Sequence, residues 1–329
     1  MRTLILSRAE VEKVLSVNEA IRAVEAAFRE KGMGRVQMPP KSYVFFEEYD
    51  GDFRTMPAYL RKIGAAGVKV VNVHQKNKKR GLPTVMATII LLDPKTGHPL
   101  AVMDGTFITN IRTGAAGVLA AKHLARKNSE SVGMVGSGVQ ARFQLMALLE
   151  RFDPGEVRAW SRNMNCARNY AAWAKKNLDI CVSVERRVED AVRGADIIVT
   201  TTPSRVPLVM NEWVSEGTHI NAIGADAPGK QELDPAILRR SKLVIDDMEQ
   251  ATHSGEINVP LSKNEITTDH IYAELGEIVC GRKRGRTSDD EITVFDSTGL
   301  AVQDIATAAF VYRKAVKKGL GKEVDLIGA

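Results

Sequence analysis

The sequence contains few of the residues that mark secreted, metal-binding or membrane-spanning proteins. Its 329 residues include only three cysteines, which are far apart and odd in number, and this pattern argues against a disulfide framework. The cysteines also lack the spacing of metal ligands, and none of the six histidines belongs to an H-x-x-x-H pair, so we expect no metal site. The longest apolar runs, such as Thr84–Leu92, are too short to cross a bilayer, and the N-terminus lacks the apolar segment of a signal peptide. We therefore expect a cytoplasmic protein with no membrane partner.

Aromatic residues are also scarce, at 5% of the chain, and this bears on the interpretation of its basic charge. The net charge is +6, and basic clusters occur at residues 76–80 and 282–286. Clusters of this kind can bind nucleic acid, but they are also found in the solvated loops of basic enzymes that bind anionic ligands. Because no aromatic side chains interleave with either cluster, we favour the second interpretation and expect no nucleic-acid partner.

The first 130 residues have the pattern of helices followed by a mainly antiparallel sheet. Ser7-x-x-Glu10 and Ser16-x-x-Glu19 both match the capping box, and an apolar stripe after Ser16 predicts a helix that ends near Gly32. Asp93-Pro94-Lys95-Thr96-Gly97 is typical of the turn in an antiparallel hairpin. The strands that we expect are 42–46, 53–60, 68–73, 84–92 and 100–103, followed by an alanine-rich helix over 109–126.

From residue 131 onward, strand and helix patterns alternate, which is the rhythm of a doubly wound parallel sheet. The final helix, over 300–318, could return to the first block of the chain and make that domain discontinuous. We therefore predict an α/β protein with a Rossmann domain at 113–301 and a discontinuous α+β domain at 1–112 and 302–329. The expected strands of the parallel sheet are 132–135, 157–160, 180–184, 197–200, 219–223, 243–246 and 293–295.

The most informative motif is the stretch SVGMVGSGVQA at Ser131–Ala141, which joins a short apolar strand to a helix. This is the context in which a G-x-G-x-x-G/A pattern indicates dinucleotide binding. Gly136 allows a sharp turn, and Gly138 lets backbone N–H groups approach a pyrophosphate at the N-terminus of the helix. We expect cofactor contacts from Gly136, Gly138, Val139 and Gln140.

Two further loops are expected to line the cofactor. In NAD-binding proteins an acidic residue ends the second strand, whereas Ser161, Arg162 and Asn163 stand there in this chain. A hydroxyl group beside a guanidinium suits a 2′-phosphate, so we favour NADP(H) over NAD(H), although an exposed Arg162 would leave a site that accepts both. The polar loop that follows the fourth strand adds Thr201, Thr202 and Pro203.

Beyond this motif, segments in one order along nearly the whole chain match a known family. They are Gln37–Tyr43, Arg54–Leu60, Gly67–His74, Gly81–Thr106, Ile108–Ala116, Val199–Arg205, Glu216–Leu233 and Phe295–Asp304. With these segments the chain resembles the ornithine cyclodeaminase/μ-crystallin family, and most closely its archaeal alanine dehydrogenase branch. The resemblance implies a homodimer, a nicotinamide bound between the two domains, and hydride transfer at the α-carbon of an amino or imino acid.

The same resemblance implies roles for several charged residues, to which composition alone assigns no function. Lys41, Arg54 and Arg112 would hold the substrate carboxylate, and Arg112 with Thr113 would contact the cofactor. Lys69, in an apolar strand, would polarise the substrate carbonyl and act as acid or base, unless it is an exposed residue of the alternate face.

The resemblance also implies that Asp226 is the proton acceptor. It follows a predicted strand at the edge where open α/β sheets place their chemistry, and the alternative is a turn residue that pairs with Lys230. Ser297 would bond the nicotinamide carboxamide. Tyr43, Met56, Tyr59 and Val73 are the residues that we expect to shape the side-chain pocket.

These roles lead us to expect an NAD(P)-dependent amino acid dehydrogenase that interconverts L-alanine with pyruvate and ammonia. Two alternatives are an ornithine or lysine cyclodeaminase and a reductase of cyclic imino acids, or ketimines. As the family resemblance implies, a cyclodeaminase carries Glu where this chain has Arg54, which would repel the amine of ornithine. A non-catalytic NADPH-binding protein is a further alternative, but it would need neither Lys69 nor Asp226.

Overall fold

The two N-terminal helices begin where the sequence places its capping boxes. In the computed structural model, which describes residues 2–328, these are α1 (Arg8–Val14) and α2 (Val17–Gly32). The backbone N–H of Ser7 donates to Glu10 Oε2 at 2.8 Å, and that of Ser16 donates to Glu19 Oε2 at 2.9 Å. Both predicted boxes are therefore confirmed, and α2 ends at Gly32 as expected.

The chain divides into two units, of which the first comprises residues up to Arg112 and from Leu300 onward. Its sheet has the strand order β18-β1-β7-β6-β5-β4-β2, with β3 paired to β4, and every neighbouring pair except β1 with β7 is antiparallel. The predicted hairpin around Asp93–Gly97 is confirmed as β6 and β7. The strands are β1 (Thr3–Leu6), β2 (Val36–Gln37), β3 (Ser42–Phe46), β4 (Gly51–Leu60), β5 (Ala65–His74), β6 (Val85–Leu92), β7 (Pro99–Asp104) and β18 (Lys322–Val324).

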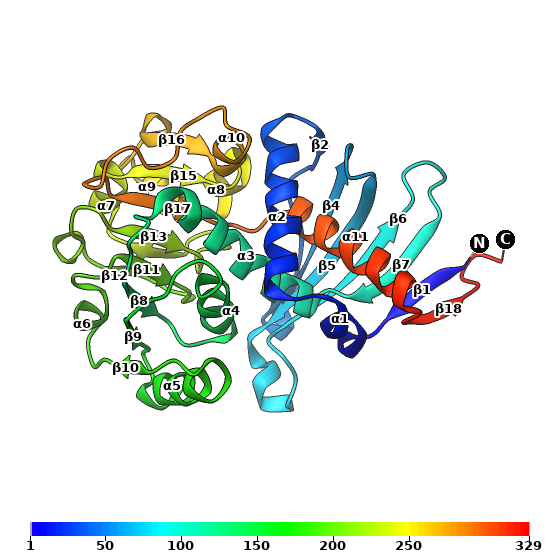
Figure 1. Ribbon diagram of the computed structural model, residues 1–329, viewed down its shortest axis with the longest axis horizontal. Coiled ribbons are helices and arrows are strands. Elements are labelled where there is room, and N and C mark those ends of the chain that lie inside the picture. The colour runs from blue at the N-terminus through cyan, green and yellow to red at the C-terminus, as the bar shows by residue number, and fades with distance from the viewer. Residues whose placement is uncertain (1, 329) are drawn as a thin grey trace. The chain divides into compact units, whose positions relative to one another are not determined.

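One face of this sheet is covered by α2 and by the C-terminal helix α11 (Ala301–Lys318), which pack against each other (Figure 1). Alternate residues of β4 and β5 are buried on that face. Gly67 of β5 permits the close approach of α11, because an added Cβ would overlap the carbonyl oxygen of Ile90 and lie 3.2 Å from Ile305 Cδ1. The covering helix thus lies directly over β5, the strand that carries Lys69.

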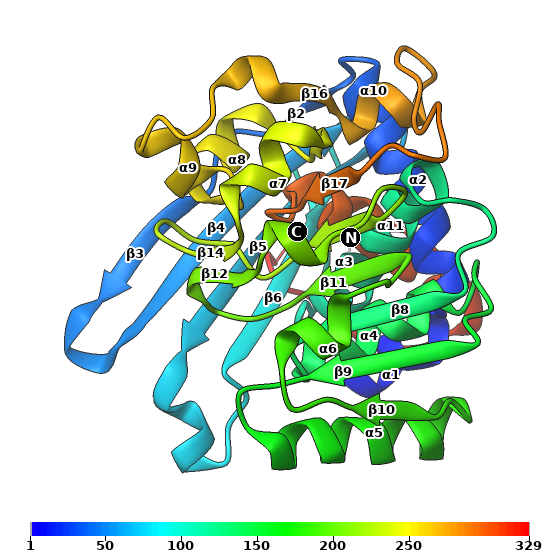
Figure 2. The same ribbon diagram turned by 90° about the vertical axis from the view of Figure 1, so that its left-hand side faces the viewer.

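The second unit, Thr113–Gly299, is built on a parallel sheet with the order β10-β9-β8-β11-β13-β17-β15-β16 (Figure 2). The chain runs outward from β8 to β10 and then crosses back to β11, so the order reverses beside β8, as in a Rossmann fold. The predicted fold class is confirmed. The strands are β8 (Ser131–Val135), β9 (Glu156–Trp160), β10 (Val182–Val184), β11 (Ile197–Thr200), β13 (His219–Ala222), β15 (Lys242–Ile245), β16 (Ile271–Glu274) and β17 (Thr293–Asp296).

Helices connect these strands, as the alternating pattern predicts. The long helix α3 begins at Thr106 and ends at Leu124, and α4 begins at Val139, directly after the glycine motif. Short strands β12 (Arg205–Val209) and β14 (Gln231–Leu233) form a separate parallel pair that we did not predict. The remaining helices are α5 (Met164–Leu178), α6 (Val188–Val192), α7 (Pro235–Arg240), α8 (Met248–Ser254), α9 (Asn258–Ser262) and α10 (Leu275–Val279).

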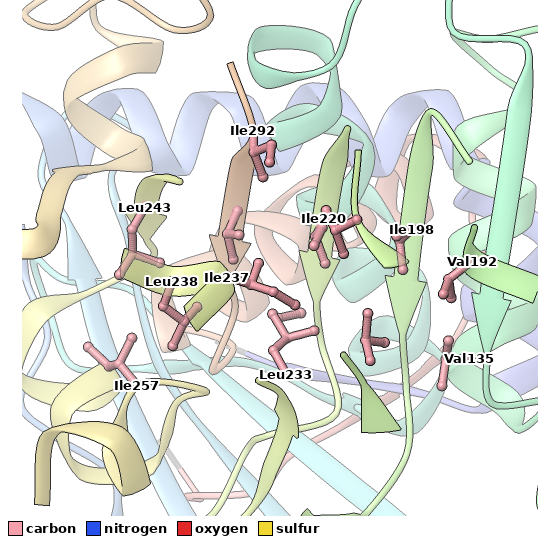
Figure 3. Close-up of a cluster of buried hydrophobic side chains, with 14 of the residues drawn as sticks. Val135, Val192, Ile198, Ile220, Leu233, Ile237, Leu238, Leu243, Ile257 and Ile292 are labelled. Atoms are coloured by element: carbon pink, nitrogen blue, oxygen red, sulfur yellow. The ribbon is translucent and has the colours of Figure 1, made fainter. Parts of the chain in front are cut away.

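The core of the second unit is aliphatic. Ile198 of β11, Ile220 of β13 and Leu243 of β15 are fully buried, and they pack with Leu233 and Ile237 from the segment that follows β13 (Figure 3). Branched side chains of this kind have few rotamers and fix the spacing between the sheet and its covering elements. Among residues 2–328, no helix combines the length and the hydropathy that a bilayer crossing requires.

Candidate functional site

The glycine motif forms a tight turn between three strands of the parallel sheet. Gly136 has a φ of +112°, and an added Cβ would lie 2.5 Å from Thr201 Oγ1, so only glycine fits at this position. The Gly136 N–H donates to the Trp160 carbonyl at 2.9 Å, and the Thr201 N–H donates to the Val135 carbonyl at 2.9 Å. The carboxyl ends of β8, β9 and β11 are therefore held together around the turn.

The first turn of α4 has the properties of an anion site. Gly138 is the N-cap residue of this helix. Among the described residues, no atom apart from those of Gly138 and its two chain neighbours lies within 4 Å of the place that a Cβ would occupy. The first N–H groups of a helix lack partners within the helix, and the helix dipole adds partial positive charge to them. Open space in front of such a helix end fits a pyrophosphate. Val139 and Gln140 lie in the first turn of this helix, and Val139 is 54% exposed.

A second observation in this unit fits a nicotinamide cofactor. Ser297 follows β17, and its N–H donates to the Ala222 carbonyl at 3.0 Å, at the carboxyl end of β13. Its side chain is 3% exposed, and its Oγ makes no hydrogen bond within residues 2–328. A buried hydroxyl group without a partner is costly, and a bound polar group would satisfy it.

The end of β9 carries the residues expected to select the cofactor. Ser161 is half-buried and Arg162 is exposed, so both side chains can reach a ligand at this edge. Asn163 is the N-cap of α5, and its side chain accepts a hydrogen bond from the Asn165 N–H at 2.9 Å. Asn163 therefore has a structural task here, whatever it contributes to a ligand.

Asp226 lies in the loop that follows β13. Its N–H donates to the Gly224 carbonyl at 3.2 Å, and its carboxylate forms an ion pair with Lys230. The pairing with Lys230 that we considered as an alternative is thus present, but the Asp226 side chain remains 39% exposed. A carboxylate in this state is accessible to a ligand as well as to its lysine partner.

Buried carboxylates that the sequence analysis missed surround these loops. Glu232 of β14 accepts hydrogen bonds from the backbone N–H groups of Thr202, at 2.6 Å, and Gly224, at 2.9 Å. Burial raises the pKa of Glu232 to about 7, although hydrogen bonds from Thr202 and Gly224 act in the opposite direction. Burial also raises the pKa of Glu256 well above its ordinary value, and the nearby charge of Glu232 adds to this effect. Within residues 2–328, no group of histidine, cysteine and carboxylate side chains is arranged to hold a metal ion.

In the first unit, Lys69 lies at the centre of a buried charge cluster. Its side chain is 1% exposed, which excludes the alternative that it points to solvent. Lys69 Nζ lies 2.7 Å from Asp304 Oδ2, and Arg112 Nε donates to Asp304 Oδ1 at 2.9 Å. Arg112 also donates to Gln303 Oε1 at 2.8 Å. Asp304, in the first turn of α11, thus joins two cations that the sequence analysis assigned to the site.

This environment tunes the acidity of the lysine. Burial lowers the Lys69 pKa from its ordinary 10.5 to about 7, and repulsion from Arg112 and Lys41 acts in the same direction, while Asp304 opposes it. An amine with a pKa near 7 exists in both protonation states at neutral pH. Lys69 can therefore donate and accept a proton, as an acid–base catalyst must.

Arg54 lies on β4, on the same face of the sheet as Lys69. It donates from Nε to Asp52 Oδ1 at 2.9 Å, and its guanidinium carbon lies 5.2 Å from the centroid of the Tyr43 ring. Cross-strand partners share a face, and the register pairs Met56 with Lys69 and Tyr43 with Arg54.

The same register tests the residues expected to shape the side-chain pocket. Alternation along β5 places Val73 on the face of Lys69, together with Met56 and Tyr43 from the neighbouring strands. Tyr59 is three residues from Met56 on β4, so it points to the opposite face. The expectation that Tyr59 lines the same pocket was therefore wrong.

Asp304, Gln303 and Asp52 are polar residues whose positions the sequence analysis did not anticipate. A signal existed for the first two, because Gln303 and Asp304 interrupt an apolar helix pattern at Ala301–Ala309, where both are fully buried. A polar residue on the buried side of a helix needs a partner. No comparable signal marked Asp52, which is next to Phe53 in an ordinary strand pattern.

Comparison with known proteins adds an independent line of evidence. Residues 1–319 match the model of the ornithine cyclodeaminase/mu-crystallin family. The chain is 54% identical to the alanine dehydrogenase of Archaeoglobus fulgidus over 324 residues, which cover 98% of each protein. The structure of an archaeal alanine dehydrogenase dimer with bound NAD superposes with a TM-score of 0.95 at 54% identity, covering 99% of this chain and 100% of that one. The Δ1-pyrroline-2-carboxylate reductase of Thermococcus litoralis, in complex with NADH and L-proline, superposes with a TM-score of 0.95 at 42% identity, covering 98% and 100%.

Proposed function

The chain belongs to the ornithine cyclodeaminase/mu-crystallin family, and we propose that it is an NAD(P)-dependent amino acid dehydrogenase that interconverts L-alanine with pyruvate and ammonia. The observation that carries this proposal is the buried Lys69, whose pKa of about 7 suits proton transfer at neutral pH. The similarity to an alanine dehydrogenase over the whole chain supports the choice of substrate.

The substrate carboxylate would be held by cations of the first unit. Arg54 and Lys41 are the proposed ligands, and Arg112 adds positive charge beside Lys69. The guanidinium of Arg54 is oriented by Asp52 and by the Tyr43 ring, and a cation oriented in advance binds a carboxylate at a low cost in entropy. The carboxylate end of the substrate would thus determine which way its α-carbon points.

Lys69 would act on the oxygen of the 2-oxo acid. In its protonated form it would polarise the carbonyl for attack by ammonia and pass its proton to the alkoxide, which gives the hydroxyl group of the carbinolamine. Asp304 holds the Lys69 ammonium group in place, since its Oδ2 lies 2.7 Å from Lys69 Nζ. Asp226 would take up a proton from the attacking amine, as an exposed carboxylate can. The proton that Asp226 takes up from the amine would then be returned to the hydroxyl group of the carbinolamine, which leaves as water.

A nicotinamide held by this unit would supply the hydride for reduction of the imine carbon, or accept it in the reverse direction. We propose that Gly136, Gly138, Val139 and Gln140 bind the pyrophosphate and that Ser297 bonds the carboxamide. Buried Thr113 is proposed as a further contact of the cofactor, together with Arg112. Thr201, Thr202 and Pro203 would line the cofactor from the neighbouring loop.

We propose NADP(H) as the preferred cofactor because Ser161 and Arg162 offer a hydroxyl group and a guanidinium where an NAD-specific site carries an acidic residue. Asn163 would add a polar contact beside them. The similar structures contain NAD and NADH, so the preference is a property on which this chain can differ from them.

We also propose that the protein is a cytoplasmic homodimer. The similar archaeal alanine dehydrogenase is a dimer, and Phe45 and Tyr49 of the first unit are more than 60% exposed, as residues of an interface are before assembly. We propose that residues 1–112 and 302–329 bind the substrate and form the dimer interface, and that residues 113–301 bind the dinucleotide.

A second candidate function is the reduction of a cyclic imino acid. The similarity to the reductase of Thermococcus litoralis favours it, since the same cations could hold the carboxylate of pyrroline-2-carboxylate. Cyclodeamination of ornithine is less favoured, because the buried Arg54 would repel the second amine of that substrate.

Steady-state oxidation of NADPH and NADH by the pure protein distinguishes these functions. With pyruvate, we expect rapid oxidation that depends on ammonium, and a higher kcat/KM with NADPH. Oxidation with pyrroline-2-carboxylate but not with pyruvate and ammonium would favour the second candidate. Ammonia release from ornithine with no net change in cofactor would favour the cyclodeaminase.

A further inference from the structure

Glu232 is a fully buried carboxylate that the proposed mechanism does not use. Its two oxygens bond to two different loops: Oε1 accepts from the Thr202 N–H at 2.6 Å, and Oε2 accepts from the Gly224 N–H at 2.9 Å. Thr202 follows β11 and Gly224 follows β13, and these strands are neighbours in the parallel sheet. One side chain therefore joins the loop of Thr201 and Thr202 to the loop of Asp226.

The two loops touch at this point, with no space between them. A Cβ added to Gly224 would overlap the Thr202 carbonyl oxygen and Glu232 Oε2. The Asp226 N–H donates to the Gly224 carbonyl, so a single residue, Gly224, links the Glu232 carboxylate to the backbone of Asp226 through two hydrogen bonds. A displacement of Gly224 would therefore be passed on to Asp226.

The backbone that carries Glu232 is in turn fixed by hydrogen bonds to other buried carboxylates. Glu256 accepts hydrogen bonds from the N–H groups of Glu232, at 2.8 Å, and Leu233, at 2.6 Å. Asp296, which ends β17, accepts from the N–H groups of Glu256, at 2.9 Å, and Ile257, at 3.2 Å. Asp296 thus fixes the backbone of Glu256, and Glu256 fixes the backbone of Glu232. All three side chains are fully buried.

We infer that Glu232 is a positioning residue, which sets Thr202 against the cofactor and Asp226 against the substrate. The inference rests on the proposed function for the roles of Thr202 and Asp226, and on the hydrogen bonds of Glu232 for the coupling between them. Three buried acids linked in this way stabilise a fold at a high cost in desolvation free energy, because each must be removed from water. These acids lie at the carboxyl ends of the strands, where the proposed chemistry takes place, and fixing the loops there is a reason to retain them despite the desolvation cost.

Two variants test the inference, and a third serves as a matched control. Glu232→Gln keeps the volume but turns an NH2 group toward one of the two backbone N–H groups, which releases that loop. Gly224→Ala forces the loops apart without a change of charge. Asp196→Asn is the control. Asp196 also accepts from two backbone N–H groups, those of Glu130 at 2.8 Å and Ser131 at 3.0 Å, and pairs with Arg126, but it directly precedes β11 and so lies at the amino ends of the strands.

The measurements are kcat and KM with pyruvate and ammonium, the dissociation constant of NADH without substrate, and hydrogen–deuterium exchange of the peptides that contain Thr202 and Gly224. In the first two variants, we expect faster exchange in these peptides, weaker NADH binding and a kcat that falls at least roughly tenfold, because small misplacements of reacting groups cost this much. Asp196→Asn should leave kcat and the NADH constant within about twofold of the parent, as expected for a change remote from the site.

An unchanged exchange rate in both peptides, or an unchanged kcat together with unchanged NADH binding, would overturn the inference. If the parent protein does not turn over pyruvate and ammonium, the proposed function fails, and exchange together with NADH binding still decides the role of Glu232. If Glu232→Gln does not fold, Gly224→Ala decides it by the same measurements.

Discussion

Replacement of Lys69 by methionine should separate the stability of this protein from its activity. Methionine fills the space of the lysine stem without a charge, and Asp304 keeps its partner Arg112. The parent side chain is 1% exposed and its pKa is lowered to about 7, mainly by burial. Burial of the protonated Lys69 therefore lowers the free energy of unfolding of the parent, and this penalty is absent from the variant.

The size of the effect follows from the pKa. A pKa of about 7 in place of 10.5 corresponds to roughly 5 kcal/mol of free energy when the full titration is counted. Above pH 7 the folded lysine is neutral, while the lysine of the unfolded chain keeps its proton up to 10.5. The unfolded state then binds more protons, so the stability that this residue contributes rises with pH, by about 2 kcal/mol between pH 7 and 9.

The assay is urea unfolding of the parent and of Lys69→Met at pH 7 and at pH 9. We expect the free energy of unfolding of the parent to rise by about 2 kcal/mol more than that of the variant over this interval. The kcat of the variant should fall by about 10²- to 10⁴-fold, the usual contribution of a general acid–base group. Lys13→Met, at an exposed lysine of α1, is the control and should change neither quantity. Equal pH dependence in the parent and Lys69→Met, or full activity in the variant, would refute the reasoning.

Three further substitutions test other parts of the site. Asp226→Asn should lower kcat by about 10²-fold or more with little change in NADH affinity, as measured by steady-state kinetics and fluorescence titration; full turnover would remove Asp226 from the mechanism. Ser161→Asp should shift the ratio of kcat/KM values toward NADH by at least about tenfold, since a carboxylate repels the 2′-phosphate, and an unchanged ratio would count against the proposed cofactor preference. Gly67→Ala should cost about 1–3 kcal/mol in urea unfolding and lower kcat, because its Cβ would push α11 and Asp304 away from β5; unchanged stability would contradict this packing.

The fold could be predicted from the sequence to a large extent, because its strongest signals are local. The capping boxes, the hairpin turn at Asp93–Gly97 and the glycine motif at Ser131–Ala141 each act over a few residues, and each is present in the structure. The missed strands are short, and each pairs with a segment elsewhere in the sequence, such as Pro99–Asp104 for β1; they are β1, β2, β12, β14, β16 and β18.

The charged groups of the candidate site were harder to predict. Lys69 and Arg112 were selected from the sequence, but the carboxylate that joins them belongs to Asp304, more than 190 positions further along the chain than Arg112. Pairing across this distance is a property of the tertiary fold, and a single sequence contains no record of it. Glu232 was missed for the same reason, since its partners Thr202 and Gly224 lie in other loops.

The most direct test of the central claim follows the hydride itself. The protein is incubated with pyruvate, ammonium and a reduced cofactor that carries deuterium at the nicotinamide C4 position, each face being tested in turn, and the products are analysed by mass spectrometry. The account predicts that L-alanine forms with one deuterium at its α-carbon, from one face only, and that Lys69→Met forms little of it. Absence of labelled alanine, with label instead in proline when pyrroline-2-carboxylate is offered, would contradict it.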